Sequence, residues 1–181
     1  MLITPDYLEQ QKLMHAAGNY GKGVDAGECI VHLSKLWKPG FTVLDYGCGQ
    51  GVLTRRLSDL DFSRSGEQHI IVPAEYDPAI PGKDDMPAPA DIVVCADVLE
   101  HVEAECLPHV MEHLEQLTQG FIIAIIATGK AKKTLPDGRN AHILLKRPGE
   151  WWKIFHNHFN ILRYENRHAA GRGVLLIGEK K

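Results

Sequence analysis

Short apolar runs recur along the chain and alternate with segments of helical spacing. The runs that predict buried strands are 41–44, 69–72, 91–96 and 120–126, the second of which continues to about residue 77. Runs of this kind are typical of strands buried on both faces of a parallel sheet. Two further strands are predicted at 159–164 and 173–177, and their spacing favours a closing antiparallel hairpin.

Helices are predicted between these runs. Thr4 and Pro5 mark the start of the first, because a capping hydroxyl precedes a proline at the first helical position, and this helix should run to about Ala17. A glycine-rich break at 19–23 precedes a second helix, which ends before 38–40. Further helical segments are expected at 52–57, at 103–119 and from 148 onward.

This alternation predicts an α/β fold of the doubly wound type, a mostly parallel sheet with a C-terminal antiparallel hairpin. The segment between the second strand and the next one is an exception. Only residues 79–90 are available there, and they include Pro81, Pro87 and Pro89. Proline at this density leaves no room for a helix and a strand, so the third βα unit is predicted to be missing or reduced to a loop.

The turn after the first strand carries the strongest functional signal. Asp45 precedes it, and glycines follow at Gly47, Gly49 and Gly51 before helical spacing resumes. A strand, a glycine turn and a helix hold phosphates or cofactors in doubly wound folds, because glycine lets the backbone pass close to a ligand. The spacing is not the Gly-x-Gly-x-x-Gly of dinucleotide-binding folds, and no P-loop Gly-Lys-Ser/Thr follows.

The stretch from Val43 to Gly51 closely resembles the first motif of class I S-adenosylmethionine-dependent methyltransferases. The resemblance implies that the glycine turn, including Cys48, lies against the methionyl part of the cofactor and that Asp45 lies near its ammonium. The stretch Asp97-Val-Leu-Glu-His101 is similar to the one that follows the fourth strand in this family.

The resemblance extends from about Val24 to the end of the chain. It implies one compact domain, in which residues 41–181 form a Rossmann-like methyltransferase domain. Residues 1–40 would form N-terminal helices, either as a lid over the cofactor cleft or only as a cover for the sheet edge.

Other acidic residues resemble cofactor contacts of the same family. Asp77 ends the second strand, where an acidic residue accepts hydrogen bonds from ribose hydroxyls, and Glu75 competes for this role. The stretch Asp84-Asp85-Met86 resembles the adenine-side motif, which implies that Asp85 or Asp84 meets the exocyclic amine and Met86 packs on the ring. A solvated acidic turn explains the same residues. Asp97 is also a candidate cofactor contact.

Three residues are candidates for removing a proton from the methyl acceptor: His101, His142 and Asp97. A histidine with an unperturbed pKa near 6.5 suits proton transfer at neutral pH. Asp97, Glu100 and His101 lie within five residues, and the long polar loop over 128–147 can bring His142 to them. Loops of this length are more often functional than idle.

Two carboxylates and two imidazoles also suit Mg²⁺, Mn²⁺ or Zn²⁺, with Glu100, His101 and His142 as ligands. The pattern resembles metal-dependent small-RNA 3′-terminal 2′-O-methyltransferases, in which Glu-x-x-Glu-His is joined by a later histidine. Asp97 replaces the first glutamate here, and Asp-x-x-Glu-His also occurs in metal-free relatives.

Composition limits the possible partners. The formal net charge of −3 leaves no overall basic field for nucleic acid, and no apolar run reaches membrane-spanning length. Four scattered cysteines and the absence of a signal-peptide pattern favour reduced thiols in a cytoplasmic protein. The loop over 128–147 is locally basic, which favours an anionic small-molecule acceptor, a nucleotide or a nucleic-acid end, although a solvated loop explains the charges equally well.

We therefore expect a methyltransferase that uses S-adenosylmethionine. A non-catalytic S-adenosylmethionine-binding subunit of a larger enzyme is the first alternative. A dehydrogenase that uses NAD is the second, and the glycine spacing disfavours it. The acceptor and the oligomeric state are not encoded in any recognisable pattern.

Overall fold

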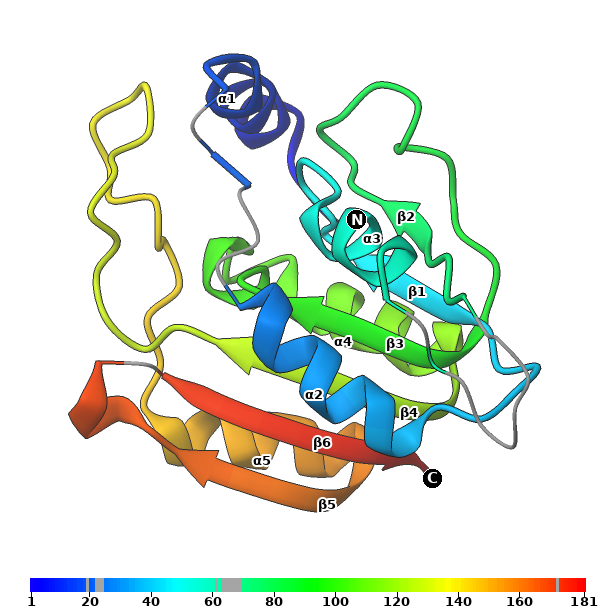
Figure 1. Cartoon of the computed structure of the whole chain (residues 1–181). Coiled ribbons are helices and arrows are strands. Elements are labelled where there is room, and N and C mark those ends of the chain that lie inside the picture. Colours follow the sequence, from blue (N-terminus) through cyan, green and yellow to red (C-terminus); the bar gives the residue numbers. More distant parts are fainter. Residues whose placement is uncertain (19, 22–24, 61, 63–69, 172) are drawn as a thin grey trace.

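A computed structural model describes residues 1–18, 20–21, 25–60, 62, 70–171 and 173–181. Six strands in the described part form one mixed sheet in the order β2-β1-β3-β4-β6-β5 (Figure 1). They are β1 (Val43–Tyr46), β2 (Ala74–Tyr76), β3 (Ala90–Ala96), β4 (Thr118–Ile126), β5 (Phe159–Asn166) and β6 (Val174–Lys180). The first four run parallel, and β6 pairs antiparallel with both β4 and β5, so the predicted fold class is confirmed.

The helices are α1 (Pro5–Ala16), α2 (Ala26–Leu36), α3 (Val52–Ser58), α4 (Leu107–Leu117) and α5 (Pro148–His158), with short 3₁₀ turns η1 (Leu99–His101) and η2 (His168–Ala170). Successive side chains of a strand point to opposite faces of the sheet. Val43 of β1 therefore packs in the core with α2 and α3, whereas Leu44 packs in the core with α4 and α5. Helices thus cover both faces, as a doubly wound sheet requires.

The third βα unit is absent, as the prolines predict. Residues 77–89 connect β2 to β3 with neither helix nor strand. The second strand is also shorter than predicted. Its predicted start, His69, lies outside the described residues, and Ile70 and Val72 are exposed rather than buried. Pro73 has no N–H for a ladder hydrogen bond, which agrees with a strand that begins only at Ala74.

Several helix boundaries differ slightly from the sequence-based expectation. α1 ends at Ala16, and α4 spans Leu107–Leu117 rather than 103–119. Pro108 lies in the first turn of α4. The N–H that proline lacks would have no intrahelical partner there, so no hydrogen bond is lost. The glycine-rich break expected at 19–23 falls mostly outside the described residues.

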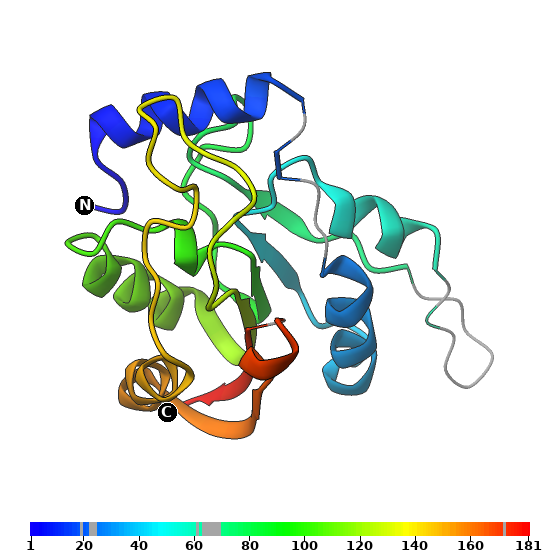
Figure 2. The same ribbon diagram turned by 90° about the vertical axis from the view of Figure 1, so that its left-hand side faces the viewer.

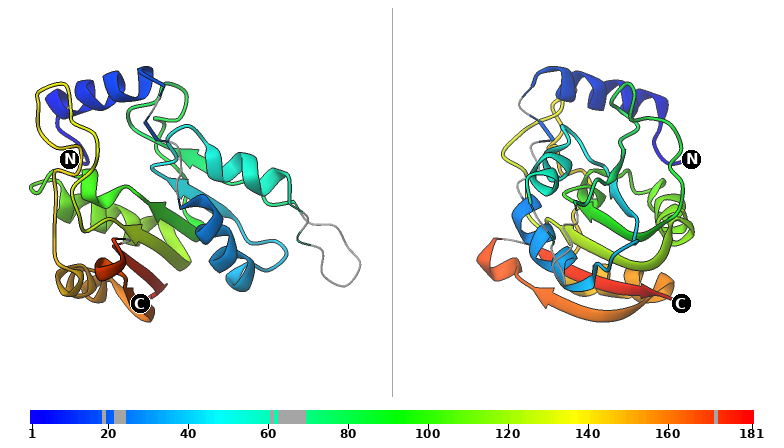
Figure 3. Two further views of the ribbon diagram at one scale, coloured as in Figure 1. Left: turned by 60° about the vertical axis from the view of Figure 1, so that its left-hand side comes forward. Right: turned by 45° about the vertical axis from the view of Figure 1, so that its right-hand side comes forward.

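α1 lies above the carboxyl ends of the strands, beside the long segment 127–147 (Figures 2 and 3). Thr4 anchors its first turn, because the Thr4 backbone N and Oγ1 both donate to the Glu103 carboxylate, at 2.9 and 2.7 Å. Gln10 Nε2 donates to Asp137 Oδ2 of the long segment at 2.8 Å. A small third core, separate from those of the sheet, contains Tyr7, Leu135 and Ala141. We call α1 and segment 127–147 together the roof.

All four cysteines are free and buried, in agreement with the expectation of reduced thiols. In the part of the chain that the structure describes, none of the helices has both the length and the hydrophobicity of a membrane span.

Two glycines before β6 allow a matched test of the fold. At Gly173, φ is +76° and an added Cβ would lie 2.0 Å from the Ile126 carbonyl oxygen; at Gly171, φ is +70° but the space is open. We expect Gly173→Ala to lower the free energy of unfolding by roughly 3 kcal/mol, because a steric clash adds to the cost of a left-handed backbone. Gly171→Ala should cost only about 1–2 kcal/mol. Urea denaturation measures both, and equal losses would contradict this packing.

Candidate functional site

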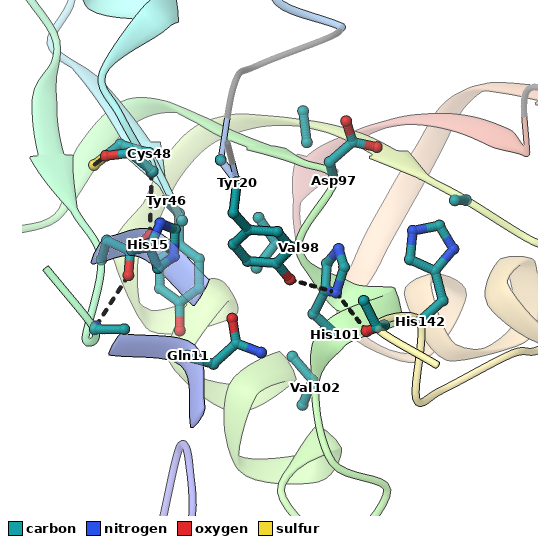
Figure 4. Close-up of a pocket in the computed structure, with 18 of the residues that line it drawn as sticks. Gln11, His15, Tyr20, Tyr46, Cys48, Asp97, Val98, His101, Val102 and His142 are labelled. Atoms are coloured by element: carbon teal, nitrogen blue, oxygen red, sulfur yellow. Dashed lines mark hydrogen bonds and ion pairs between the residues drawn. The ribbon is translucent and has the colours of Figure 1, made fainter. Parts of the chain in front are cut away.

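One cavity of about 710 Å³ lies at the carboxyl ends of β1, β2 and β3, beneath the roof (Figure 4). The glycine turn, the loop after β2, the start of η1 and both parts of the roof contribute to its walls. Of the residues proposed from the sequence, those that line it are Asp45, Gly47, Cys48, Gly49, Asp77, Asp97, His101 and His142. Ligands of doubly wound folds bind at this edge of the sheet.

The glycine turn is held from two sides. Gly49 N donates to Asp77 Oδ2 at 3.1 Å, and Gln50 N donates to the Gly21 carbonyl oxygen at 3.0 Å. Gly49 has φ of +52°, and a Cβ at this position would lie 2.8 Å from the Gly21 oxygen. The backbone of the N-terminal segment therefore requires glycine at this position, whether or not a ligand also approaches it. Gly51 caps α3 and does not line the cavity.

Asp45 lies at the floor of the cavity and is almost completely buried. Burial, and secondarily the negative charge of Glu75, raises the pKa of the Asp45 carboxyl to about 7. A buried carboxyl with a raised pKa favours a cationic ligand, since a positive charge stabilises its ionised form.

The structure separates the two carboxylates that competed for the ribose role. Glu75 lies outside the cavity and forms an ion pair with Lys83 at 2.8 Å. Asp77 lines the cavity, and its two oxygens accept from Gly49 N and Ala79 N. Each carboxylate oxygen has a second lone pair, so Asp77 can still accept bonds from hydroxyls.

The predicted adenine contacts are not brought to the cavity. Met86 is 71% exposed, Asp85 is exposed as well, and neither lines the cavity. Asp84 is also outside, where Oδ1 accepts from Gly82 N within its own turn at 3.0 Å. The acidic turn therefore has the solvated arrangement that the sequence left open.

Acidic side chains gather beyond the glycine turn. Asp97 has a left-handed backbone with φ of +56°, and burial together with Asp25 raises its carboxyl pKa to about 6. Glu100 is fully buried; Oε1 accepts from Ala127 N at 2.8 Å, whereas Oε2 has no hydrogen-bond partner. Burial and the neighbouring Asp97 raise the pKa of the Glu100 carboxyl well above its usual value. Within the described ranges, neither Asp97 nor Glu100 has an ion-pair partner.

Two imidazoles face these acids. His101 Nδ1 lies 2.7 Å from the Ala141 carbonyl oxygen, and His142 Nδ1 lies 2.6 Å from that of Gly129. A carbonyl oxygen only accepts, so both protons are assigned to Nδ1 and both Nε2 lone pairs remain available. The ring centroids are 4.9 Å apart. Burial, and then the neighbouring His142, lowers the pKa of His101 to about 4, so its ring is neutral at pH 7.

This arrangement fits a divalent cation. One ligand atom from each of Glu100, His101 and His142 lies within 4.8 Å of the others. Histidines that bind metals commonly donate their other ring N–H to a backbone carbonyl, which both of these do. The unpartnered Oε2 of Glu100 is a hard oxygen donor at the same place.

Sequence reasoning missed several residues of the site. Asn140 fixes the long segment, because its Oδ1 accepts from Ala131 N and His142 N, at 2.9 and 3.1 Å. The roof also contributes Tyr7, Gln11 and His15 to the cavity. Their spacing of four residues places them on one helix face, but polar residues at that spacing are normally expected to face water.

Basic residues of the long segment divide between two locations. Lys130, Lys132 and Lys133 line the cavity, whereas the segment's three other basic residues do not. The predicted basic loop therefore contributes positive charge at the rim, on the side of His142.

The fold is similar to those of several solved methyltransferases. The 1,6-didemethyltoxoflavin-N1-methyltransferase of Burkholderia thailandensis, with bound 1,6-didemethyltoxoflavin and S-adenosylhomocysteine, has a TM-score of 0.62 and 15% identity over 100% of this chain and 92% of that chain. The DhpI complex with S-adenosylhomocysteine has a TM-score of 0.62 and 17% identity over 98% of each chain.

Magnesium protoporphyrin IX methyltransferase of Synechocystis PCC 6803, with bound S-adenosylhomocysteine, has a TM-score of 0.57 and 20% identity over 89% of this chain and 84% of that chain. No protein-family model and no curated protein sequence matches this sequence. The likeness to these structures agrees with the strand order and with the position of the glycine turn. The fold of this chain is that of the class I S-adenosylmethionine-dependent methyltransferases.

Proposed function

We propose that this protein transfers the methyl group of S-adenosylmethionine to a small acceptor molecule. The observation that carries the proposal is the single cavity that joins the glycine turn and Asp77 at one end to His101 and His142 at the other. A cofactor and an acceptor can therefore meet inside one cavity. Holding two reactants in line supplies much of the rate enhancement that methyl transfer needs.

The cofactor end is assigned to the glycine turn and two carboxylates. When bound, S-adenosylmethionine supplies a methyl group on a positively charged sulfonium. Asp45 would hold the ammonium of its methionyl group, and Asp77 would accept hydrogen bonds from its ribose hydroxyls. Gly47, Cys48 and Gly49 let the backbone pass close to the bound molecule.

The acceptor end is assigned to Asp97, His101 and His142. Asp97 is the best matched base, because its pKa of about 6 is close to neutrality. Because its pKa is lowered, the His101 ring is a weak base. Its neutral Nε2 is better suited to donate a lone pair to a cation than to remove a proton. His142 lies on the long segment, where the Gly129 carbonyl oxygen holds its Nδ1.

We also propose that Glu100, His101 and His142 hold a divalent cation. A bound cation would act as a Lewis acid and polarise an oxygen of the acceptor. Glu100 is fixed by Ala127 N, and both histidines are fixed by backbone carbonyls, so these ligands are held in place without the ion.

A small acceptor is favoured over a nucleic-acid end. The structural relatives that bear substrate names act on toxoflavin and porphyrin compounds. The roof encloses the acceptor end from above, and the three lysines at the rim favour an anionic group on the acceptor. A nucleotide remains compatible with the same chemistry.

Cofactor binding and turnover test the proposal together. We expect calorimetry to detect S-adenosylhomocysteine binding to the wild type, and Asp77→Asn to weaken it at least about tenfold because it weakens bonds to the ribose. Asp85→Asn is the matched control and should bind as the wild type does. Labelled S-adenosylmethionine with a panel of small acceptors measures transfer; cofactor binding without turnover would support a non-catalytic subunit instead.

The raised pKa of Asp45 predicts a pH dependence of cofactor binding. A ligand ammonium favours the carboxylate, and that form is lost as the pH falls below about 7. S-adenosylhomocysteine should therefore bind about tenfold more weakly at pH 6 than at pH 8. Calorimetry should find a smaller pH dependence for Asp45→Asn. An unchanged pH profile in this variant would remove Asp45 from the account.

The cation assignment predicts a stabilisation by metal. Millimolar Mn²⁺ or Mg²⁺, or micromolar Zn²⁺, should raise the melting temperature of the wild type, because a ligand that binds only the folded state stabilises it. His142→Ala should lose this shift, whereas His109→Ala, on the exposed side of α4, should keep it. No shift in the wild type, with transfer unaffected by chelator, would contradict the metal site.

A further inference from the structure

α1 buries polar residues and exposes apolar ones. Gln11 is 7% exposed and Tyr7 is 2% exposed, whereas Leu13 is 60% exposed. Tyr7, Gln11 and His15 are four residues apart, so they share the face that lines the cavity. A surface helix normally shows the reverse arrangement, with its apolar stripe toward the core. The inversion places polar side chains against the cavity, beside the small core that contains Tyr7.

The polar side chains on this face are buried with few partners. Among the described residues, Tyr7 Oη, Gln11 Nε2 and His15 Nδ1 make no hydrogen bond of standard geometry, and the Gln11 carboxamide interacts with the phenols of Tyr7 and Tyr20. Burying a polar group without a hydrogen bond is unfavourable, and native structures rarely leave such groups unmatched. A ligand in the cavity would supply the missing partners.

His15 fixes the position of this face relative to the ribose site. Its Nε2 lies 3.8 Å from Asp77 Oδ2. Gln11 is one helical turn further along α1, about 6 Å by the rise of 1.5 Å per residue. Figure 4 shows the Gln11 carboxamide in the cavity between His15 and Val102. A group attached to a ribose at Asp77 would therefore reach Gln11.

The surroundings of Gln11 suit a flat apolar ring. Ile3, Val98 and Val102 line the cavity on this side and are partly buried. The third βα unit is absent, and Asp85 and Met86 are exposed, so the motif expected to contact the adenine does not reach the cavity. Another part of the chain must therefore take that role.

We propose that α1 recognises the adenine of the cofactor, with Gln11 as the residue that reads its edge. A carboxamide offers one donor and one acceptor side by side. Adenine presents an amine donor beside a ring-nitrogen acceptor, and glutamine pairs with this pattern in nucleic-acid recognition. Tyr7 lies one turn before Gln11 in α1 and lines the same cavity. This inference rests on the proposed function, because it requires the cofactor in the cavity.

Two nucleosides that differ only at the adenine edge provide the test. Calorimetry compares S-adenosylhomocysteine with its 6-deamino analogue, in which hydrogen replaces the amine and the Gln11 oxygen loses its donor whichever way the carboxamide is turned. The wild type should prefer the adenosine compound by at least about tenfold, because a buried site built for a hydrogen bond rejects the analogue that lacks the bonding group. Gln11→Met should bind S-adenosylhomocysteine about tenfold more weakly and lose most of the preference.

Gln10→Met is the matched control, since Gln10 bonds to Asp137 on the roof and does not line the cavity. It should keep the preference even if looser closure weakens both ligands equally. Thermal melts establish that each variant folds. If Gln11→Met does not fold, Gln11→Ala is used in its place. Equal binding of both compounds by the wild type, or an unchanged preference in the Gln11 variant, overturns this inference alone. No binding of S-adenosylhomocysteine by the wild type overturns the proposed function as well.

Discussion

The carboxylate of Asp77 holds together the end of the cavity that contains the glycine turn. It accepts hydrogen bonds from Gly49 N at 3.1 Å and Ala79 N at 3.0 Å, and it lies 3.8 Å from His15 Nε2. These contacts join the turn after β1, the loop after β2 and the roof, which are far apart in the sequence. Hydrogen bonds to a buried charge are stronger than those in water, because the surrounding dielectric is low. The Asp77 side chain thus ties the turn after β1 to the loop after β2 and lies close to the roof.

The main elements of the fold could be predicted because they depend on local patterns. The run before Asp45 and the glycine spacing after it determine a strand and a tight turn without help from distant residues. The prolines at 81, 87 and 89 predicted the absent third unit for the same reason. The second strand was predicted too long, because Ile70 and Val72 have the composition of a strand but lie at the surface next to Pro73. Apolar composition alone does not reveal which residues find a neighbouring strand.

The sequence offered a lid over the cleft or a cover for the sheet edge for the N-terminal helices and could not decide between them, because their placement depends on contacts between distant parts of the chain. Thr4 bonds to Glu103, which is 99 residues away, and this contact helps to determine which face of α1 points inward. Polar residues of a surface helix are normally expected to face water. Gln11 contradicts this rule, because it is polar and buried. Likewise, the motif around Asp85 is present in the sequence but is exposed, since no third strand and helix hold it against the cavity.

The interior and the rim of the cavity differ in electrostatic character. Asp45, Asp97 and Glu100 are buried carboxyls with raised pKa values, and the rim above His142 carries lysines. Cations are thus favoured in the interior and anions at the entrance. This gradient suits a positively charged cofactor seated deep in the cavity and an anionic partner that approaches from outside.

The closure between α1 and the long segment has a consequence for the speed of the proposed reaction. The two parts meet through the Gln10–Asp137 contact and a small core around Tyr7 and Leu135. So limited an area separates at a far smaller free-energy cost than global unfolding. Separation of the two parts would widen the exit for a spent nucleoside, so the frequency of this opening would contribute to the rate of turnover together with the chemical step.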